Sequence, residues 1–239
     1  MAVNSTTEEY EGVELEVMLL FLMELIEQAT AAKVSYGQLV AALEIDVPLH
    51  IPEQDDGEIP VEYHGEINRY LLDSRLKMAR IFLAVQGVLT SAAPISKLLW
   101  MSQPQRREGC TCPPEEADEA RFAQAKRRCK ALRKALGIAN EMPELNRRVR
   151  NSLEHYDDRM DRWLAADDGT IYATGVGPPD SVGDGTQGFM RGFDPPTMTA
   201  SVRGDSISLP ELMGAVEDLS SRAKQWLQAN TAYTPPPDI

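Results

Sequence analysis

Hydrophobic residues recur along this chain at helical rather than strand spacing. In the first third they step by three or four positions from Glu14 to Ala32, which places them on one face of an α-helix. The expected buried stripe of this helix is Leu15, Leu19, Leu22, Met23, Ile26 and Ala29. Ser35 is a residue type that favours the N-cap position, so we expect a second, short helix to run from there through Leu43.

The longest helical pattern runs from Tyr63 to Trp100 and is apolar around much of its circumference. Its apolar members are Ile67, Tyr70, Leu71, Leu76, Met78, Ile81, Phe82, Val85, Val88 and Leu89. This pattern is typical of the central helix of a bundle. Pro94 lacks a backbone N–H group and is expected to kink or break the helix.

Two further amphipathic helices are expected. The first spans Glu115 to Leu136, with Cys129 on its buried stripe and Gly137 as its C-terminal cap. The second spans Glu144 to Ala165, and its apolar stripe is Leu145, Val149, Leu153, Tyr156, Met160 and Trp163. At about 100° per residue, the opposite face of this second helix collects Arg150, Asn151, Glu154, His155, Asp158 and Arg162.

The last third changes from helical to strand-like patterns. Short strands are expected at Thr170–Thr174, Phe189–Phe193, Met198–Val202 and Ser206–Leu209. A helix capped by Ser208, with Pro210 in its first turn, should follow. We therefore expect a mainly α fold, with a helical bundle over residues 1–166, a β-hairpin plus helix packed on it over 167–232, and a disordered tail over 233–239.

The net charge of the chain and the distribution of its basic residues limit the classes of function that fit the sequence. The net charge of -13 repels polyanions at long range, which argues against a protein that coats nucleic acid non-specifically. Basic residues nevertheless gather in the middle third, at Arg106, Arg107, Lys126, Arg127, Arg128, Lys130, Arg133, Lys134, Arg147, Arg148 and Arg150. This cluster is compatible either with a local basic cleft or with a solvated helix face.

Cysteine usage and hydropathy predict a cytoplasmic protein without cofactor or membrane anchor. The three cysteines cannot all pair within the chain, and no signal peptide precedes them. Cys110-Thr111-Cys112 lacks the ligand spacing of a zinc site, so no metal is expected. The longest apolar runs are interrupted before the roughly 20 residues that a membrane span requires.

The string from Arg150 to His155 resembles the signature of the HEPN superfamily, in which an arginine and a polar residue precede a histidine. The stretch from Ala84 to Trp100 resembles the preceding core helix in an uncharacterised bacterial HEPN-like group. The resemblance covers roughly Tyr63 to Leu164, with weaker similarity over Phe189 to Leu227, and the connection Gln105 to Arg128 is longer here. It implies a helical bundle, a homodimer with facing motif helices, and metal-independent endoribonuclease activity.

RNA cleavage without a metal needs a base, an acid and positive charge at the phosphate. His155 has the chemistry for proton transfer, Arg150 for holding the phosphate, and Asn151 for orienting either group. Arg150 and His155 lie about 140° apart around the helix, so a second subunit would complete the site. Such an enzyme would act as a toxin or as a stress or defence effector, with an antitoxin or regulator as protein partner.

Three other readings remain open at this point. Arg150 and Glu154 have the spacing of an ordinary exposed ion pair, and the carboxylates around His155 would repel RNA. The motif helix would then serve a non-catalytic dimer, or an adaptor that binds a nucleotide or a protein. The acidic charge of the whole chain also fits an antitoxin or regulator that neutralises a basic partner.

Overall fold

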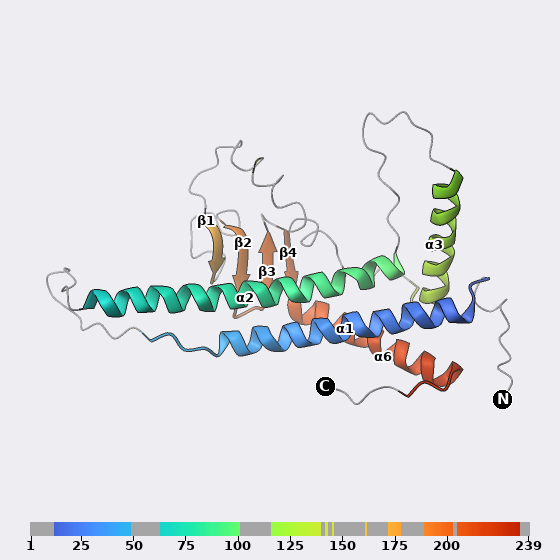
Figure 1. The fold of residues 1–239 in the computed structure, drawn as a ribbon, viewed down its shortest axis with the longest axis horizontal. Helices are drawn as coiled ribbons and strands as arrows, with labels where there is room; N and C mark the ends of the chain where they lie inside the picture. The colour runs from blue at the N-terminus through green and yellow to red at the C-terminus, as the bar shows by residue number, and fades with distance from the viewer. Residues whose placement is uncertain are drawn as a thin grey trace.

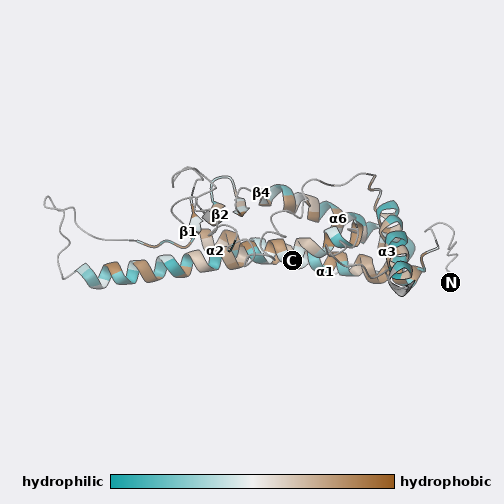
Figure 2. Cartoon of the chain, turned by 90° about the horizontal axis from the view of Figure 1, so that it is seen from above, coloured by the Kyte–Doolittle hydropathy of each residue, from teal (hydrophilic) through white to brown (hydrophobic). Residues whose placement is uncertain are grey.

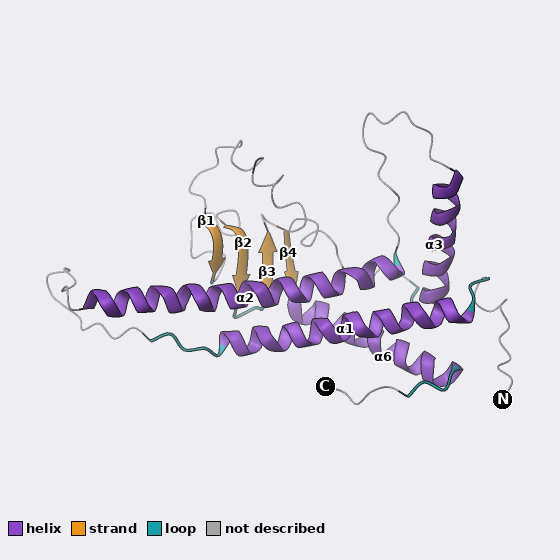
Figure 3. Ribbon diagram, viewed as in Figure 1, coloured by secondary structure: helices purple, strands orange, loops and turns teal. Residues whose placement is uncertain are grey.

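The computed structural model describes residues 12–48, 63–100, 116–139, 142, 145, 161, 172–177, 189–202 and 205–234. Long helices dominate this part of the chain, which confirms the mainly α prediction (Figures 1 and 3). The helices are α1 (Leu15–Leu43), α2 (His64–Leu99), α3 (Glu116–Ala135) and α6 (Leu209–Asn230). The strands are β1 (Tyr172–Val176), β2 (Phe189–Asp194), β3 (Thr199–Val202) and β4 (Asp205–Ser208).

Helix α1 is continuous, so the predicted second helix at Ser35 is wrong. Ser35 lies in the middle of α1, where the backbone of α2 comes close: a Cβ atom added at Gly87 would lie 2.6 Å from the Ser35 Oγ. Ser35 is therefore a packing residue rather than a cap, because α2 stabilises the helix on both sides of it. The predicted stripe of α1 is also wrong at Met23, whose side chain is 48% exposed.

Helix α2 begins and ends where the hydrophobic pattern predicts. Tyr63 is its N-cap, and the Trp100 N–H donates to the Ser96 carbonyl at its end. Of the kink or break predicted at Pro94, a break is excluded, since the helix continues through the proline. Ala92 and Ile95 on either side of the proline are buried, and this packing holds the helix together despite the missing backbone hydrogen bond.

The first half of α2 is not a core helix. Figure 1 shows it extending past the end of α1, and Figure 2 shows it apart from the other described elements. Leu71 and Leu76, which were predicted to be core residues, are 48% and 51% exposed. The prediction of a central helix therefore holds only from Ile81 onward, where α2 contributes its buried residues.

By length and composition, α2 is the one described helix that passes a test for a membrane-crossing helix. Of its most apolar 18-residue window, 39% is buried inside the protein. The core helix of a soluble protein passes the same test, so the result is weak evidence.

The strands form one four-stranded sheet in the order β1-β2-β3-β4. Strands β2, β3 and β4 pair antiparallel, whereas β1 pairs parallel with β2. Each of the four strands overlaps one that the sequence predicts, but together they form one sheet rather than a hairpin. The sheet lies beside α2, where the Arg191 guanidinium is 5.9 Å from the centroid of the Phe82 ring.

Helix α6 follows β4 directly and brings the end of the chain back to α1. The Ser208 side chain accepts a hydrogen bond from the Glu211 N–H, which confirms the predicted cap. The apolar face of the helix is buried, with Leu212, Val216, Leu219, Ala223 and Trp226 among its members. One hydrophobic cluster joins α1, α2, α3, α6 and the sheet.

Each of the first three helices ends against a cation from another helix. Lys77 Nζ donates to the Ile45 carbonyl oxygen at 2.6 Å, Arg133 Nη1 donates to that of Leu99, and Arg222 Nη1 donates to that of Leu136 at 3.2 Å. Carbonyls at helix C-termini lack intrahelical donors and carry partial negative charge, so the contacts of Arg133 and Arg222 are favourable, whereas Ile45 lies two residues beyond the end of α1. Gly137, with φ of 64°, closes α3 as predicted, and the Ile138 N–H donates to the Arg133 carbonyl.

Candidate functional site

The predicted catalytic residues Arg150, Asn151 and His155 lie outside the described residues. The structure therefore neither brings them together nor separates them. Cys110 and Cys112 also lie outside the described ranges.

Two positions of the predicted motif helix are described. Leu145 is 5% exposed and belongs to the hydrophobic cluster, and its N–H donates to the Met142 carbonyl at 3.0 Å. Asp161 is helical and exposed. Both agree with the predicted faces of this helix, in which Leu145 is on the apolar stripe and Asp161 is not.

The second stretch of the family resemblance lies in the core. Ala84, Val85 and Ala92 are buried, and Ser96 is a buried polar residue that is 4% exposed. The small side chains in this part of α2 permit the close approach of α1 at Gly87. This stretch therefore supports the fold and does not itself form a reactive surface.

The basic residues of α3 do not form one cleft. Arg133 binds the end of α2 by donating a hydrogen bond to the Leu99 carbonyl. Arg127 and Arg128, together with Arg121, face the first turns of α1 instead. The basic cluster read from the sequence thus divides into a residue that supports the fold and a group that faces a cavity.

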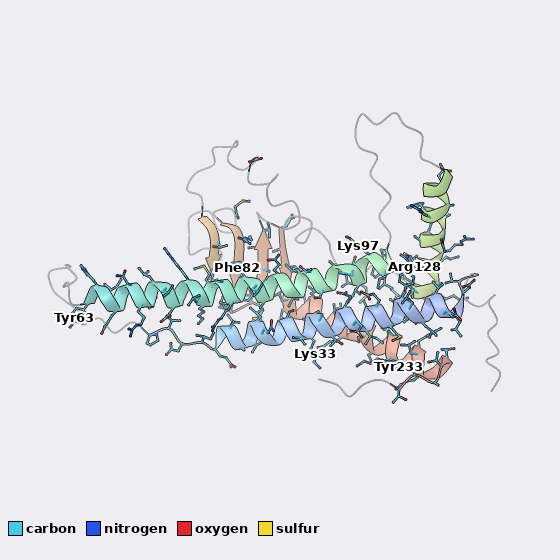
Figure 4. All side chains as sticks on the ribbon, in the orientation of Figure 1. Lys33, Tyr63, Phe82, Lys97, Arg128 and Tyr233 are labelled. Atoms are coloured by element: carbon cyan, nitrogen blue, oxygen red, sulfur yellow. The ribbon has the colours of Figure 1, made fainter. Side chains whose placement is uncertain are left out.

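The cavity between α1 and α3 has a volume of about 390 Å³. Gly12, Val13 and Glu14 line it from the start of α1, and the rest of that side is apolar. Arg128 lies where α3 passes α1 (Figure 4), with its guanidinium carbon 4.3 Å from the centroid of the Phe21 ring. This arrangement is a cation–π contact.

The Arg128 side chain is incompletely paired. Its Nε atom is buried and has no hydrogen-bond partner, and its Nη2 atom has a weak contact with Cys129 Sγ at 3.9 Å. A buried unsatisfied donor costs about 1–3 kcal/mol, so such groups are uncommon in native proteins. A molecule in the cavity cannot reach this buried Nε, so Arg128 contributes its positive charge to the lining rather than that donor.

Sequence reasoning singled out Arg127 and Arg128 as members of the basic cluster but missed the cavity and Arg121. The positions of the three arginines, at Arg121, Arg127 and Arg128, were visible as helical spacing along α3. That α1 begins opposite them is a long-range contact, which no local pattern in the sequence reveals.

No group of three or more His, Cys, Asp or Glu side chains that could hold a metal occurs among the residues with described positions. Cys129 is a free, buried thiol that is 2% exposed, as its place on the apolar stripe predicted. Comparisons of the chain with protein-family models, with curated proteins and with solved structures gave no match.

Proposed function

We propose that this protein is a metal-independent endoribonuclease that acts as a homodimer in the cytoplasm, as a toxin or as a stress or defence effector. The observation that carries the proposal is the string Arg150-Asn151 followed by His155, on the polar face of an amphipathic helix and preceded by the Ala84–Trp100 stretch. The described structure supports it in two respects. That stretch is a core helix, and Leu145 anchors the start of the motif segment in the same core.

In this proposal His155 transfers protons, and Arg150 stabilises the negative charge of the phosphate in the transition state. The imidazole titrates near neutral pH, so it can accept the proton of the ribose 2′-hydroxyl or donate one to the leaving 5′-oxygen. The guanidinium of Arg150 can hold the phosphate by two parallel hydrogen bonds and stabilise the charge of the phosphorane. Asn151 orients the imidazole or a phosphate oxygen.

The homodimer follows from the geometry of a single helix. Because Arg150 and His155 point about 140° apart around the helix axis, one helix cannot present both to one phosphate. A twofold axis beside the helix places Arg150 of one subunit near His155 of the other.

The test is cleavage of a mixed RNA pool in EDTA by the wild-type protein and three variants. His155→Ala should lose about 10²–10⁴-fold in rate, because general acid–base catalysis contributes that much. Arg150→Ala should lose about 10²–10³-fold, the usual effect of removing one group that stabilises transition-state charge.

Arg148→Ala is the matched control, since it removes an equal charge from the same segment without touching the motif. It should retain the wild-type rate. Equal rates in all four proteins would show that cleavage has another source. Intact dimers without cleavage would favour the alternative function, a non-catalytic dimer or an adaptor for a nucleotide or a protein partner.

A further inference from the structure

We infer that the cavity between α1 and α3 is a binding site for a small organic phosphate. The site uses residues other than Arg150, Asn151 and His155, so it stands independently of the proposed nuclease activity. Its volume of about 390 Å³ lies within the range of about 300–1,000 Å³ that small-molecule pockets occupy.

The charge of the lining selects an anion. The lining contains three arginines, Arg121, Arg127 and Arg128, and one acid, Glu14. Arg121 has an interaction of its own, so Arg127 and Arg128 carry the argument. This excess of positive charge stands in a chain whose net charge is -13, so the cavity is a local exception to the field of the whole protein. Guanidinium groups bind phosphate oxygens in pairs, with planar geometry.

Two further features of the lining favour an anion. Within the described chain Arg127 is exposed and makes no ion pair. Helix α1 also begins at the cavity, and its N-cap residue Glu14 makes no side-chain hydrogen bond to the helix. The first N–H groups of α1 therefore add partial positive charge on the side opposite the arginines.

The apolar part of the lining indicates that the phosphate carries an organic group. Val13, which precedes α1, and Val17 and Phe21 of α1 form this part. Removing an apolar group of the ligand from water against these side chains is favourable, whereas inorganic phosphate would leave them uncovered. An organic phosphate should therefore bind more tightly than phosphate alone.

The test is a calorimetric titration of the full-length protein with phenyl phosphate and, separately, with inorganic phosphate. Both titrations use the same fixed ionic strength. We expect saturable binding of both, with phenyl phosphate at least tenfold tighter. Arg127→Gln should weaken both by about tenfold, and Arg128→Gln by at least as much, because each removes a charge-assisted hydrogen bond. Glu14→Gln should strengthen both, because it removes the one carboxylate of the lining.

Lys126→Gln is the matched control, since Lys126 is an exposed neighbour on the same helix that does not line the cavity. It should change neither affinity by more than about twofold. Because Arg128 packs on Phe21, its replacement can disturb folding, so circular dichroism is recorded for each variant. Arg127 is exposed, so the affinity of Arg127→Gln reports on binding without a change in folding. Absence of saturable binding, or an equal loss in Lys126→Gln and Arg127→Gln, would overturn the inference.

Discussion

The two halves of α2 both carry large apolar residues at helical spacing, but the first half also holds six of the seven charged residues of the helix, and the surroundings of the two halves differ. From Ile81 to Leu99 the helix supplies all of its buried residues, whereas from His64 to Arg80 none is buried. Leu72 in the first half is 57% exposed, and Leu99 in the second half is fully buried. The cause is the partner helix: α1 has 29 residues and α2 has 36, and the first turns of α2 extend past the end of α1 (Figure 1). Hydrophobic spacing thus predicts a helix and its apolar face, but the covering of that face depends on elements distant in sequence.

The sharpest test of this difference replaces the same residue type in each half. Leu99→Ala should lower the free energy of unfolding by about 2–5 kcal/mol, since it leaves a cavity in a packed core. Leu72→Ala should change it by less than about 0.5 kcal/mol, because the side chain is largely in water. Urea denaturation of both variants provides the measurement, and similar losses in the two would show that the first half is covered as well.

A smaller effect is expected from the two glycines of α2. Gly87→Ala should lower the free energy of unfolding by about 1–2 kcal/mol, because the new Cβ would meet Ser35 Oγ at 2.6 Å and Ser35 Cβ at 3.0 Å. Gly65→Ala meets nothing within 4 Å and should be neutral or stabilising by up to about 1 kcal/mol.

The variant Gly87→Ala with Ser35→Ala separates packing from helix propensity. Removing the Oγ should restore part of the lost stability in thermal denaturation. If Gly87→Ala alone is as stable as Gly65→Ala, the close approach of α1 and α2 is not present in solution.

The smallest effect concerns Lys77, which links the exposed half of α2 to the end of α1. Lys77→Met keeps the aliphatic stem and removes the hydrogen bond to the Ile45 carbonyl, so it should cost about 0.5–1.5 kcal/mol. Lys97→Met, on the exposed side of the second half, is the control and should cost almost nothing. Chemical denaturation at low and high salt compares them, and equal stabilities would mean that the Lys77 contact contributes nothing.

The sequence predicted the elements better than their partners. The bounds of α2, the cap at Ser208, the glycine at the end of α3 and the buried Cys129 follow from local rules, and the structure confirms them. The absence of a helix start at Ser35 and of a break at Pro94 has a shared cause, because packing between α1 and α2 overrides local preferences. The parallel pairing of β1 with β2 also depends on a long-range contact.

The two candidate sites also differ in whether they depend on local sequence or on long-range contacts. The motif from Arg150 to His155 is a local string that can be read from the sequence, although its geometry lies outside the described residues. The arginine-lined cavity is the reverse case. It exists only because the start of α1 lies against α3, and neither helix alone indicates it.

The central claim is that His155 and Arg150 cleave RNA without a metal, and the most direct measurement is the chemistry of the fragment ends. RNA incubated with the wild-type protein in EDTA should yield fragments with 2′,3′-cyclic phosphate and 5′-hydroxyl ends, because the attacking group is the ribose 2′-hydroxyl. His155→Ala should yield none of them. Fragments with 3′-hydroxyl and 5′-phosphate ends, or cyclic ends produced equally by His155→Ala, would contradict the account.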